Sequence, residues 1–575
     1  MIRLLRYLKP FRGAVALVLV LVFLQSLANL YLPTLMADIV DKGIVTGDTD
    51  YIVRIGGLML LITLGGTICA VVASFFSARS AVGFGRLVRG KLFAHVEGFS
   101  LHEFDTVGTA SLITRTTNDT NQVQQVLVLM LNVLVSAPLL AIGGVILAIA
   151  QDATLAWILV VAIPILVLAI FLIMSRAIPL FRIIQVKIDR LNLILDEGLT
   201  GVRVIRAFDR TAHERRRFDT ANRDLTETAI TVNRIVATLF PIMLLVLNLS
   251  TIAIVWFGSV RIDRGEMQIG ALIAFMQYAL QILFAMLMLS LMFVFLPRAA
   301  ASADRINAVL DMAPEIRDAE RVRPVGAQRG YVEFDDVTFS YPGAEEPALA
   351  HISFTARPGQ VTAIIGGTGA GKSSLVGLIP RFYDVASGRV LVDGVDVREL
   401  AQHDLRSRIG YVPQQAVLFS GTVAGNIRFG TESATDEQVR HAAEIAQATE
   451  FVDGMDAGFA SAIAQGGTNV SGGQKQRLSI ARALARRPEI YVFDDSFSAL
   501  DYATDARLRA ALKRETTDAT VFIVAQRVST IMDADQILVL DQGRLVGSGT
   551  HRALMESNPV YREIVLSQLS AEEVA

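Results

Sequence analysis

The chain has 575 residues, of which 52% are hydrophobic and 19% are charged, and its mean hydropathy is +0.47. This length predicts more than one domain, and this composition is too apolar for an ordinary soluble chain. The formal net charge of -2 gives no reason to expect nucleic acid as a partner, and the single cysteine, Cys69, excludes an intrachain disulfide.

The N-terminal half contains six long segments without any Asp, Glu, Lys or Arg, and each exceeds the roughly 20 residues that a helix needs to cross a bilayer. They cover residues 14–37, 55–78, 124–151, 153–175, 235–260 and 267–297. Six such segments in one half of the chain favour membrane spans over buried core helices. The first segment is too long for a signal peptide, and further spans follow it. We therefore expect a multi-pass integral membrane protein.

Basic residues determine the expected orientation. They gather at the N-terminus and in two long connections between spans, as Arg3, Arg6, Lys9, Arg12, Arg86, Arg89, Lys91, Arg203, Arg206, Arg210 and Arg215. The positive-inside rule places these segments, both termini and the soluble domain in the cytoplasm, and we expect the membrane to be a bacterial inner (cytoplasmic) membrane. The two connections, 79–123 and 176–234, have helical periodicity and are predicted to extend the spans as rigid levers.

Domain boundaries follow from changes in composition. We expect a transmembrane domain over residues 1–310 and a charged, proline-bearing linker over 311–328. Residues 329–575 have the composition of a soluble α/β domain. The predicted fold is therefore an all-α six-helix membrane domain with long cytoplasmic helical extensions, followed by an α/β domain with a phosphate-binding loop.

The stretch GGTGAGKSS follows the strand-like VTAII and fits the pattern G-x-x-x-x-G-K-[ST]. Its glycines let backbone N–H groups turn towards phosphate oxygens, and the helix that follows adds its positive end. Lys372 is expected at the β- and γ-phosphates of a nucleotide, and Ser373 at Mg²⁺. A plain glycine turn is disfavoured by the preceding strand and by an apolar run that later ends in acids. The predicted phosphate-binding residues are Gly366, Gly367, Thr368, Gly369, Ala370, Gly371, Lys372, Ser373 and Ser374.

Two further stretches of the soluble domain point to nucleotide chemistry. The run YVF ends in Asp494 and Asp495, and the first of these acids is expected to support Mg²⁺. The stretch VSGGQKQRLSIARAL opens a helix with Ser471 and two glycines, which predicts a second phosphate-binding helix end. Two such ends on one domain predict a dimer, in which each nucleotide lies between one domain's loop and the other domain's serine.

Together these motifs resemble those of ATP-binding-cassette (ABC) transporters of the exporter fold (type IV), and the resemblance covers nearly the whole chain. It implies six spans followed by one cassette that binds ATP and Mg²⁺. It also implies an aromatic residue stacked on adenine, a glutamine that links Mg²⁺ to the membrane domain, a signature motif and a loop that crosses the dimer. The matching residues are Tyr341, Gln414, Ser471, Gly472, Gly473, Gln474 and, within Ser498–Asp501, Asp501.

The family also carries short coupling helices at the tips of its two cytoplasmic levers. By position these tips lie near Ser100–Val107 and Arg206–Arg215. Phe208 and Asp209 are the expected coupling residues of the second tip, where an aromatic side chain could seat in a groove of a cassette. A solvated turn in a charged helix is the alternative interpretation.

Three positions depart from the family pattern. Asp495 stands at the position of the catalytic glutamate, Gln526 at that of the switch histidine, and Gln465 where an acid is common. Asp is one methylene shorter than Glu, and a general base must lie within hydrogen-bond reach of the water that it activates. The amide of Gln526 cannot titrate. A tolerated variant at Asp495 is the simpler alternative, but both catalytic groups are replaced together.

We interpret this combination as the degenerate-site subunit of a heterodimeric exporter. The expected partner is a homologous ABC half-transporter with an intact catalytic glutamate and histidine. The site of this chain would bind ATP and hydrolyse it slowly, so that the chain's own ATPase activity is low. Its intact signature would complete the hydrolytic site of the partner.

Polar residues within the spans are candidates for a substrate cavity, and helix-to-helix hydrogen bonds are an equally good explanation for any one of them. They are Gln25, Asn29, Asn248, Gln277 and Gln281. We expect export of a hydrophobic or amphipathic compound, drug-like or lipid, in contact with membrane lipids. A lipid flippase or an importer of a lipophilic ligand is possible on the same fold, because a fold does not fix direction. An ATP-gated regulatory or channel-like protein is the alternative from another class.

Overall fold

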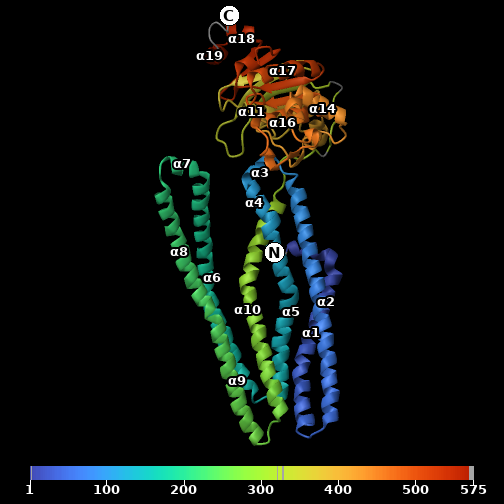
Figure 1. Cartoon of the computed structure of the whole chain (residues 1–575), viewed down its shortest axis with the longest axis vertical. Helices are drawn as coiled ribbons and strands as arrows, with labels where there is room; N and C mark the ends of the chain where they lie inside the picture. Colours follow the sequence, from blue (N-terminus) through green and yellow to red (C-terminus); the bar gives the residue numbers. More distant parts are fainter. Residues whose placement is uncertain (2, 320, 325, 327–328, 569–575) are drawn as a thin grey trace. The chain divides into compact units, whose positions relative to one another are not determined.

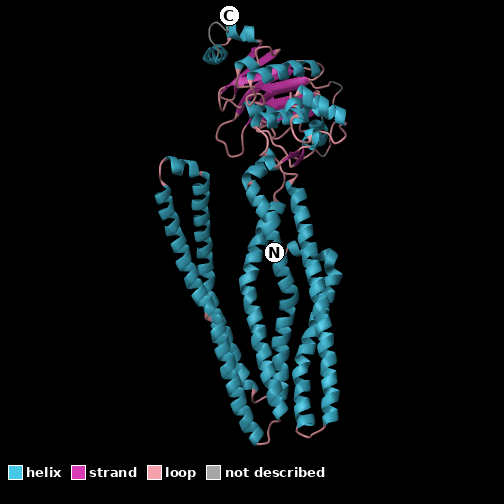
Figure 2. Ribbon diagram, in the orientation of Figure 1, coloured by secondary structure: helices cyan, strands magenta, loops and turns pink. Residues whose placement is uncertain are grey.

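The computed structural model describes residues 1, 3–319, 321–324, 326 and 329–568 (Figure 1). Residues 320, 325 and 327–328 of the predicted linker, and residues 569–575 of the predicted soluble domain, lie outside the described residues, as does residue 2. The chain forms two compact units. The helical unit combines Met1–Glu97 with Ala110–Met312, and the α/β unit combines Gly98–Thr109 with Ala313–Ala575. Figure 2 shows only helices and loops in the described part of the helical unit, whereas the strands belong to the α/β unit.

Six helical stretches of the described chain are long and apolar enough to cross a membrane, which confirms the predicted spans. They are Leu4–Ile44, Thr49–Val96, Thr109–Gln151, Ala156–Thr200, Thr211–Asp263 and Ile269–Asp311. Each stretch is longer than the charge-free segment that it corresponds to, because the helix continues past the apolar part. The elements of this unit are η1 (Leu4–Phe11), α1 (Arg12–Asp38), η2 (Ile39–Ile44), α2 (Thr49–Val96), α4 (Thr109–Thr114), η3 (Arg115–Asp119), α5 (Thr120–Gln151), α6 (Ala156–Thr200), α7 (Val202–Ala207), α8 (Thr211–Ala237), α9 (Leu239–Asp263) and α10 (Ile269–Asp311).

The connection over residues 176–234 forms a lever of two helices. The second half of α6 and the whole of α8 lie side by side (Figure 1). Lys187 Nζ joins the two helices, because it donates to Asp224 Oδ1 at 2.6 Å and to Thr228 Oγ1 at 2.7 Å. The short helix α7 forms the tip and contains no buried residue. It ends one residue before Phe208, so the tip helix begins earlier in the chain than Arg206–Arg215.

The other long connection carries α3 (Leu101–Val107), which packs within the α/β unit and not within the helical unit. A capping box opens α3, in which Glu103 Oε2 accepts the Ser100 N–H at 2.5 Å. The other oxygen, Oε1, accepts the Glu315 N–H at 2.9 Å. Burial alone would raise the pKa of the Glu103 carboxyl, but the hydrogen bonds from Ser100 and Glu315 lower it. This carboxylate therefore attaches α3 to the first residues that follow α10.

The described strands form a six-stranded, a four-stranded and a two-stranded sheet. The six-stranded sheet has the order β12–β11–β3–β10–β9–β6, with β12 antiparallel and the other strands parallel. The four-stranded sheet, β2–β1–β4–β5, is antiparallel. The strands are β1 (Val332–Phe339), β2 (Leu349–Ala356), β3 (Val361–Gly366), β4 (Ser387–Val392), β5 (Val395–Asp396), β6 (Ile409–Val412), β7 (Gly421–Thr422), β8 (Ala462–Ile463), β9 (Ile490–Asp494), β10 (Thr520–Val524), β11 (Gln536–Asp541) and β12 (Arg544–Gly549).

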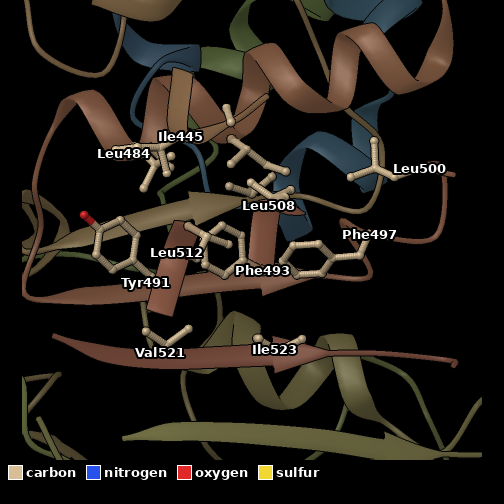
Figure 3. Packing of buried hydrophobic residues seen from close by; sticks show 14 of the residues in the cluster. Ile445, Leu484, Tyr491, Phe493, Phe497, Leu500, Leu508, Leu512, Val521 and Ile523 are labelled. Atoms are coloured by element: carbon tan, nitrogen blue, oxygen red, sulfur yellow. The ribbon is translucent and has the colours of Figure 1, made fainter. Parts of the chain in front are cut away.

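Helices cover the six-stranded sheet and bury its apolar strands. The helices that follow β3 are α11 (Lys372–Leu378), α12 (Gln402–Ser407), α13 (Val423–Arg428), α14 (Asp436–Ile445), α15 (Thr449–Asp453), α16 (Gly472–Ala485), α17 (Tyr502–Glu515), α18 (His551–Ser557) and α19 (Pro559–Gln568), with short turns η4 (Gly458–Ala460), η5 (Gln465–Gly467) and η6 (Val528–Thr530). Figure 3 shows Tyr491 and Phe493 of β9 gathered with Leu508 and Leu512 of α17 in one buried layer. Phe497 packs in the same layer, so the chain is fixed on both sides of Asp494, which ends β9, and of Asp495, which follows it.

Candidate functional site

The parallel strands bring the predicted site residues to one edge of the six-stranded sheet. β3, β10, β9 and β6 are neighbours in this order, so their carboxyl ends lie side by side. Val524 at the end of β10 pairs with Ile364 of β3 on one side and with Asp494 of β9 on the other. The phosphate loop, Gln526, the two acids and Gln414 each follow one of these strands.

A cavity of about 360 Å³ lies at this edge. It is lined by Tyr341, Ala348, Thr368, Gly369, Ala370, Gly371, Lys372, Ser373, Ser374, Gln414, Asp495, Val524 and Gln526. The aromatic ring, the phosphate loop and two of the three departures from the family pattern, Asp495 and Gln526, therefore share one cavity. The third, Gln465, lies in η5 and does not line it. Asp494 is 4% exposed and lies directly behind the loop.

The phosphate loop is held closed by its own lysine. Lys372 Nζ donates to the carbonyl of Gly366 at 2.9 Å and to that of Gly367 at 2.7 Å. Gly371 has a φ of 92° and a Cβ there would lie 2.8 Å from the Ala348 carbonyl, so this position requires glycine. Burial lowers the pKa of the Lys372 ammonium, against the pull of the nearby acids. An ammonium group that is bonded to two loop carbonyls can exchange them for phosphate oxygens.

Hydroxyl groups connect the loop to its neighbours. Ser373 Oγ donates to Asp494 Oδ1 at 2.9 Å, so the two residues predicted to hold Mg²⁺ are in contact. The hydroxyl groups of Tyr341 and Ser374 lie 2.8 Å apart, which fixes the aromatic ring beside the loop. Burial raises the pKa of the Asp494 carboxyl, and its hydrogen bonds from Ser373 and Tyr411 oppose the rise.

The Asp495 carboxylate accepts hydrogen bonds from two side-chain amides. In the described chain it has no hydrogen bond to a titratable group. Gln526 Nε2 donates to Asp495 Oδ2 at 2.7 Å, and Gln414 Nε2 approaches the same oxygen at 3.4 Å. The backbone of Asp495 is left-handed, with a φ of 47°, and its N–H donates to the Val524 carbonyl at 3.0 Å. Burial raises the pKa of the Asp495 carboxyl, while the two amide hydrogen bonds act in the opposite direction.

The signature residues do not belong to this cavity. Ser471 caps α16 through a capping box with Gln474: the Gln474 N–H donates to Ser471 Oγ at 3.3 Å, and Gln474 Oε1 accepts the Ser471 N–H at 2.9 Å. Ser471 and Gly472 are exposed, and Gly473 is half-buried. Asp501 is exposed as well and caps α17, because its Oδ1 accepts the Thr504 N–H at 2.9 Å.

The remaining predicted residues lie in the helical unit. Phe208 and Asp209 lie in the turn between α7 and α8. Phe208 is 74% exposed, and the backbone of Asp209 has a left-handed conformation with a φ of 50°. Gln281 Nε2 donates to the Asn29 carbonyl at 3.1 Å, so these two residues form a hydrogen bond between α10 and α1. Gln25 and Gln277 are half-buried, and Asn248 is exposed.

Sequence reasoning missed Tyr411, whose hydroxyl donates to Asp494 Oδ2 at 3.4 Å. Burial is the main reason that the pKa of the Tyr411 phenol is raised, and the adjacent Asp494 raises this pKa further. The available signal was its place at the end of β6, three positions before Gln414 in the motif YVPQ. A tyrosine in a strand is common, so the pattern alone gave no reason to select it.

Comparisons with known proteins agree with this architecture. The sequence matches the family described as ABC transporter transmembrane region over residues 15–286 and the family described as ABC transporter over residues 349–498. An uncharacterized ABC transporter ATP-binding protein of Mycobacterium tuberculosis is 46% identical over 567 residues, which are 98% of this chain and 97% of that protein. A fatty acid ABC transporter ATP-binding/permease protein of the same species is 34% identical over 470 residues, which are 82% and 74% of the two chains.

A solved structure of a bacterial Atm1-family ABC exporter with ATP bound has a TM-score of 0.82 and 25% identity, and the match covers 97% of this chain and 99% of that chain. The chain therefore belongs to the ABC transporter family and has the fold of an exporter. It is a multi-pass membrane protein with an ATP-binding domain, and this family couples ATP hydrolysis to transport.

Proposed function

We propose that this chain is one half of a heterodimeric ABC exporter and that its own ATP site is degenerate. Its partner would be a homologous half-transporter that keeps the catalytic glutamate and the switch histidine. Both termini and the α/β unit would lie in the cytoplasm, on the inner side of a bacterial inner membrane. The arrangement would divide the work between a site that retains ATP and a site that hydrolyses it.

The observation that carries this proposal is the contact between Gln526 and Asp495. The Gln526 amide donates to Asp495 Oδ2 at 2.7 Å, so the two side chains that differ from the family pattern are hydrogen-bonded to each other. A general base has to accept a proton from water within hydrogen-bond reach. Here the carboxylate oxygen faces amide donors, and a neutral amide can neither accept that proton nor sense a phosphate as an imidazolium would. The two substitutions therefore act as one unit that disfavours hydrolysis.

The rest of the cavity favours nucleotide binding. Lys372 and the backbone N–H groups of the loop suit phosphates, and the Tyr341 ring suits a base. Ser373 and Asp494 supply the oxygen donors that Mg²⁺ prefers, and Gln414 can contribute its amide oxygen after rotation. When bound, Mg²⁺ would neutralise phosphate charge. This chain would bind Mg-ATP firmly and turn it over slowly.

The intact signature would serve the partner. Ser471 and Gly472 are exposed at the beginning of α16, outside the cavity of their own chain. A nucleotide on the phosphate loop of a partner could therefore accept hydrogen bonds from the backbone N–H groups of Ser471 and Gly472. Phe208, in the exposed turn after α7, and the neighbouring Asp209 would couple nucleotide state to the spans by contact with a cassette.

The proposed substrate is a lipid or another amphipathic compound. The relative named as a fatty acid transporter supports a lipid. The side chains predicted for a cavity are neutral amides, among them Gln25, Gln277 and Asn248. Gln281 and Asn29 would contribute less to a cavity, because they already bond α10 to α1. Lipid flipping between leaflets fits the same features, so transport assays should include fluorescent phospholipids and fatty acids.

The experiment is to restore the missing groups in the chain alone. Purified in detergent, the unaltered chain should hydrolyse ATP very slowly. The double replacement Asp495→Glu with Gln526→His should raise its steady-state ATPase by at least about tenfold, because a working base contributes about 10²–10⁴-fold. Lys372→Ala in the doubly replaced chain is the matched control and should remove the gain. Brisk turnover by the unaltered chain, lost on Lys372→Ala, would contradict the proposal.

A further inference from the structure

The C-terminal helix α19 is fixed to the core of the α/β unit along one face. Tyr561 and Val565 are fully buried in the hydrophobic cluster that also contains Val528. The Tyr561 hydroxyl and His551 Nδ1 lie 2.7 Å apart, which anchors the first turn of the helix. Tyr561, Val565 and Gln568 have the spacing i, i+4, i+7, so they share one helix face. The end of α19 is therefore presented to the chain segment that follows β10.

The side-chain amide of Gln568 forms two hydrogen bonds with the backbone of that segment, one through its nitrogen and one through its oxygen. Its Nε2 donates to the Gln526 carbonyl at 2.8 Å, and its Oε1 accepts the Val528 N–H at 2.8 Å. A carbonyl needs a donor and an N–H needs an acceptor, so this orientation of the amide is fixed by its partners. One side chain thus bridges the loop 526–528.

The same loop carries the side chain that faces the nucleotide cavity. The Gln526 amide lines the cavity and donates to Asp495 Oδ2 at 2.7 Å. The backbone of this residue is held by Gln568, while its side chain reaches the acid. A shift of the loop would move the amide relative to Asp495 and Lys372, which mark the phosphate end of the cavity.

We propose that Gln568 is a positioning residue, through which α19 holds the loop 526–528 against the phosphate end of the ATP site. Loss of the bridge loosens Gln526 and shortens the time for which ATP stays bound. ADP is affected much less, because Gln526 and Asp495 line the cavity beside Lys372, where the terminal phosphate of ATP would lie. The proposal rests on the proposed function in one respect: the cavity takes ATP.

The first test measures dissociation of fluorescent ATP and ADP analogues from the full-length chain in detergent with Mg²⁺. Gln568→Ala should accelerate release of the ATP analogue about fivefold, the effect of losing hydrogen bonds of ordinary net strength. Release of the ADP analogue should change by less than about 1.5-fold under the same reasoning. Gln568→Glu should act in the same direction, because it keeps an acceptor for Val528 but faces the Gln526 carbonyl with a carboxylate.

Ser567→Ala is the matched control, since its hydroxyl donates to Ile564 within α19. It should leave both release rates unchanged. The decisive comparison is Gln526→Ala with the double replacement Gln526→Ala, Gln568→Ala. If Gln568 acts through Gln526, the double variant releases the ATP analogue no faster than Gln526→Ala alone.

Hydrogen exchange reports on the contact itself, without nucleotide: the Val528 amide should exchange faster in Gln568→Ala, with an unchanged melting temperature. Equal acceleration of ATP and ADP release, additive effects in the double variant, or unchanged exchange at Val528 would each overturn the proposal. Brisk ATPase by the unaltered chain would instead overturn the heterodimer proposal, and the ratio of ATP to ADP release would still decide this one.

Discussion

Two surfaces of the α/β unit can face a nucleotide, and they differ in construction. The first is the cavity at the edge of the six-stranded sheet, where Lys372 and Tyr341 stand beside the substituted Asp495 and Gln526. The second is the exposed beginning of α16, where Ser471 and Gln474 form a complete capping box. The cavity has the groups for binding but altered groups for hydrolysis, whereas the helix end keeps its family motif.

The residues that bind a nucleotide and the residues that hydrolyse it can therefore change separately. Asp495 and Gln526 sit at the ends of two adjacent strands, so they can adjust to each other without disturbing the loop after β3. In the described chain, no hydrogen bond joins the beginning of α16 to either of these residues. Under the proposed function, the chain would hydrolyse ATP slowly at its own site and would still complete the site of its partner.

The largest expected effect falls on the helix end. Gly472→Glu places an anion where a phosphate would meet backbone N–H groups. In the reconstituted pair it should lower steady-state ATPase by about 10²–10⁴-fold, as loss of the partner's own base would. Gly472→Ala is the control, because a Cβ at this position meets nothing within 4 Å. If Gly472→Glu leaves ATPase unchanged, the beginning of α16 does not serve the hydrolytic site.

The next effect separates binding from hydrolysis within the cavity. Lys372→Ala removes the cation that spans the Gly366 and Gly367 carbonyls. Retention of ATP at this site should fall about 10–100-fold, the range for charged hydrogen bonds. Trapped nucleotide counted for each heterodimer should drop, while total ATPase falls far less than in Gly472→Glu. Equal losses of ATPase in the two variants would show that both surfaces belong to working sites.

A third variant tests transmission to the spans, with both nucleotide surfaces intact. Phe208 is 74% exposed, so its replacement should not unfold the lever. Phe208→Ala should weaken docking on a cassette by about 5–30-fold, as for an aromatic interface anchor, and should lower transport per ATP. Phe208→Tyr keeps the ring and serves as the control. Transport measured in sealed vesicles with an unchanged ratio to ATP hydrolysed would show that the turn is merely solvated.

The smallest expected effect is at Asp495. Asp495→Asn removes a carboxylate that is proposed not to act as a base, so total ATPase of the pair should fall less than about threefold, instead of the 10²–10⁴-fold of a working base. The equivalent change at the partner's acid should nearly abolish activity. An Asp495→Asn pair as inactive as the partner's mutant would identify Asp495 as a competent base and end the proposed division between the sites.

Much of this site could be predicted from short stretches of sequence. The phosphate loop is a local motif, and the contact between Ser373 and Asp494 follows once both are assigned to one metal ion. The spans were recognisable because charge is excluded from a bilayer core. The second lever tip was predicted too late in the chain, because α7 starts at Val202, directly after Gly201, and ends at Ala207.

The six spans, the phosphate loop, the signature and the substitutions at Asp495 and Gln526 could be identified without a structure, because each depends on residues that are adjacent in the chain. Three contacts became visible only in the folded chain: Gln526 bonds to Asp495, Gln568 bridges the loop 526–528, and Glu103 accepts the Glu315 N–H. These contacts join residues far apart in the chain, and a glutamine or glutamate has several donors or acceptors that suit many partners. Strand order and helix docking select the partner, and no local pattern contains that information.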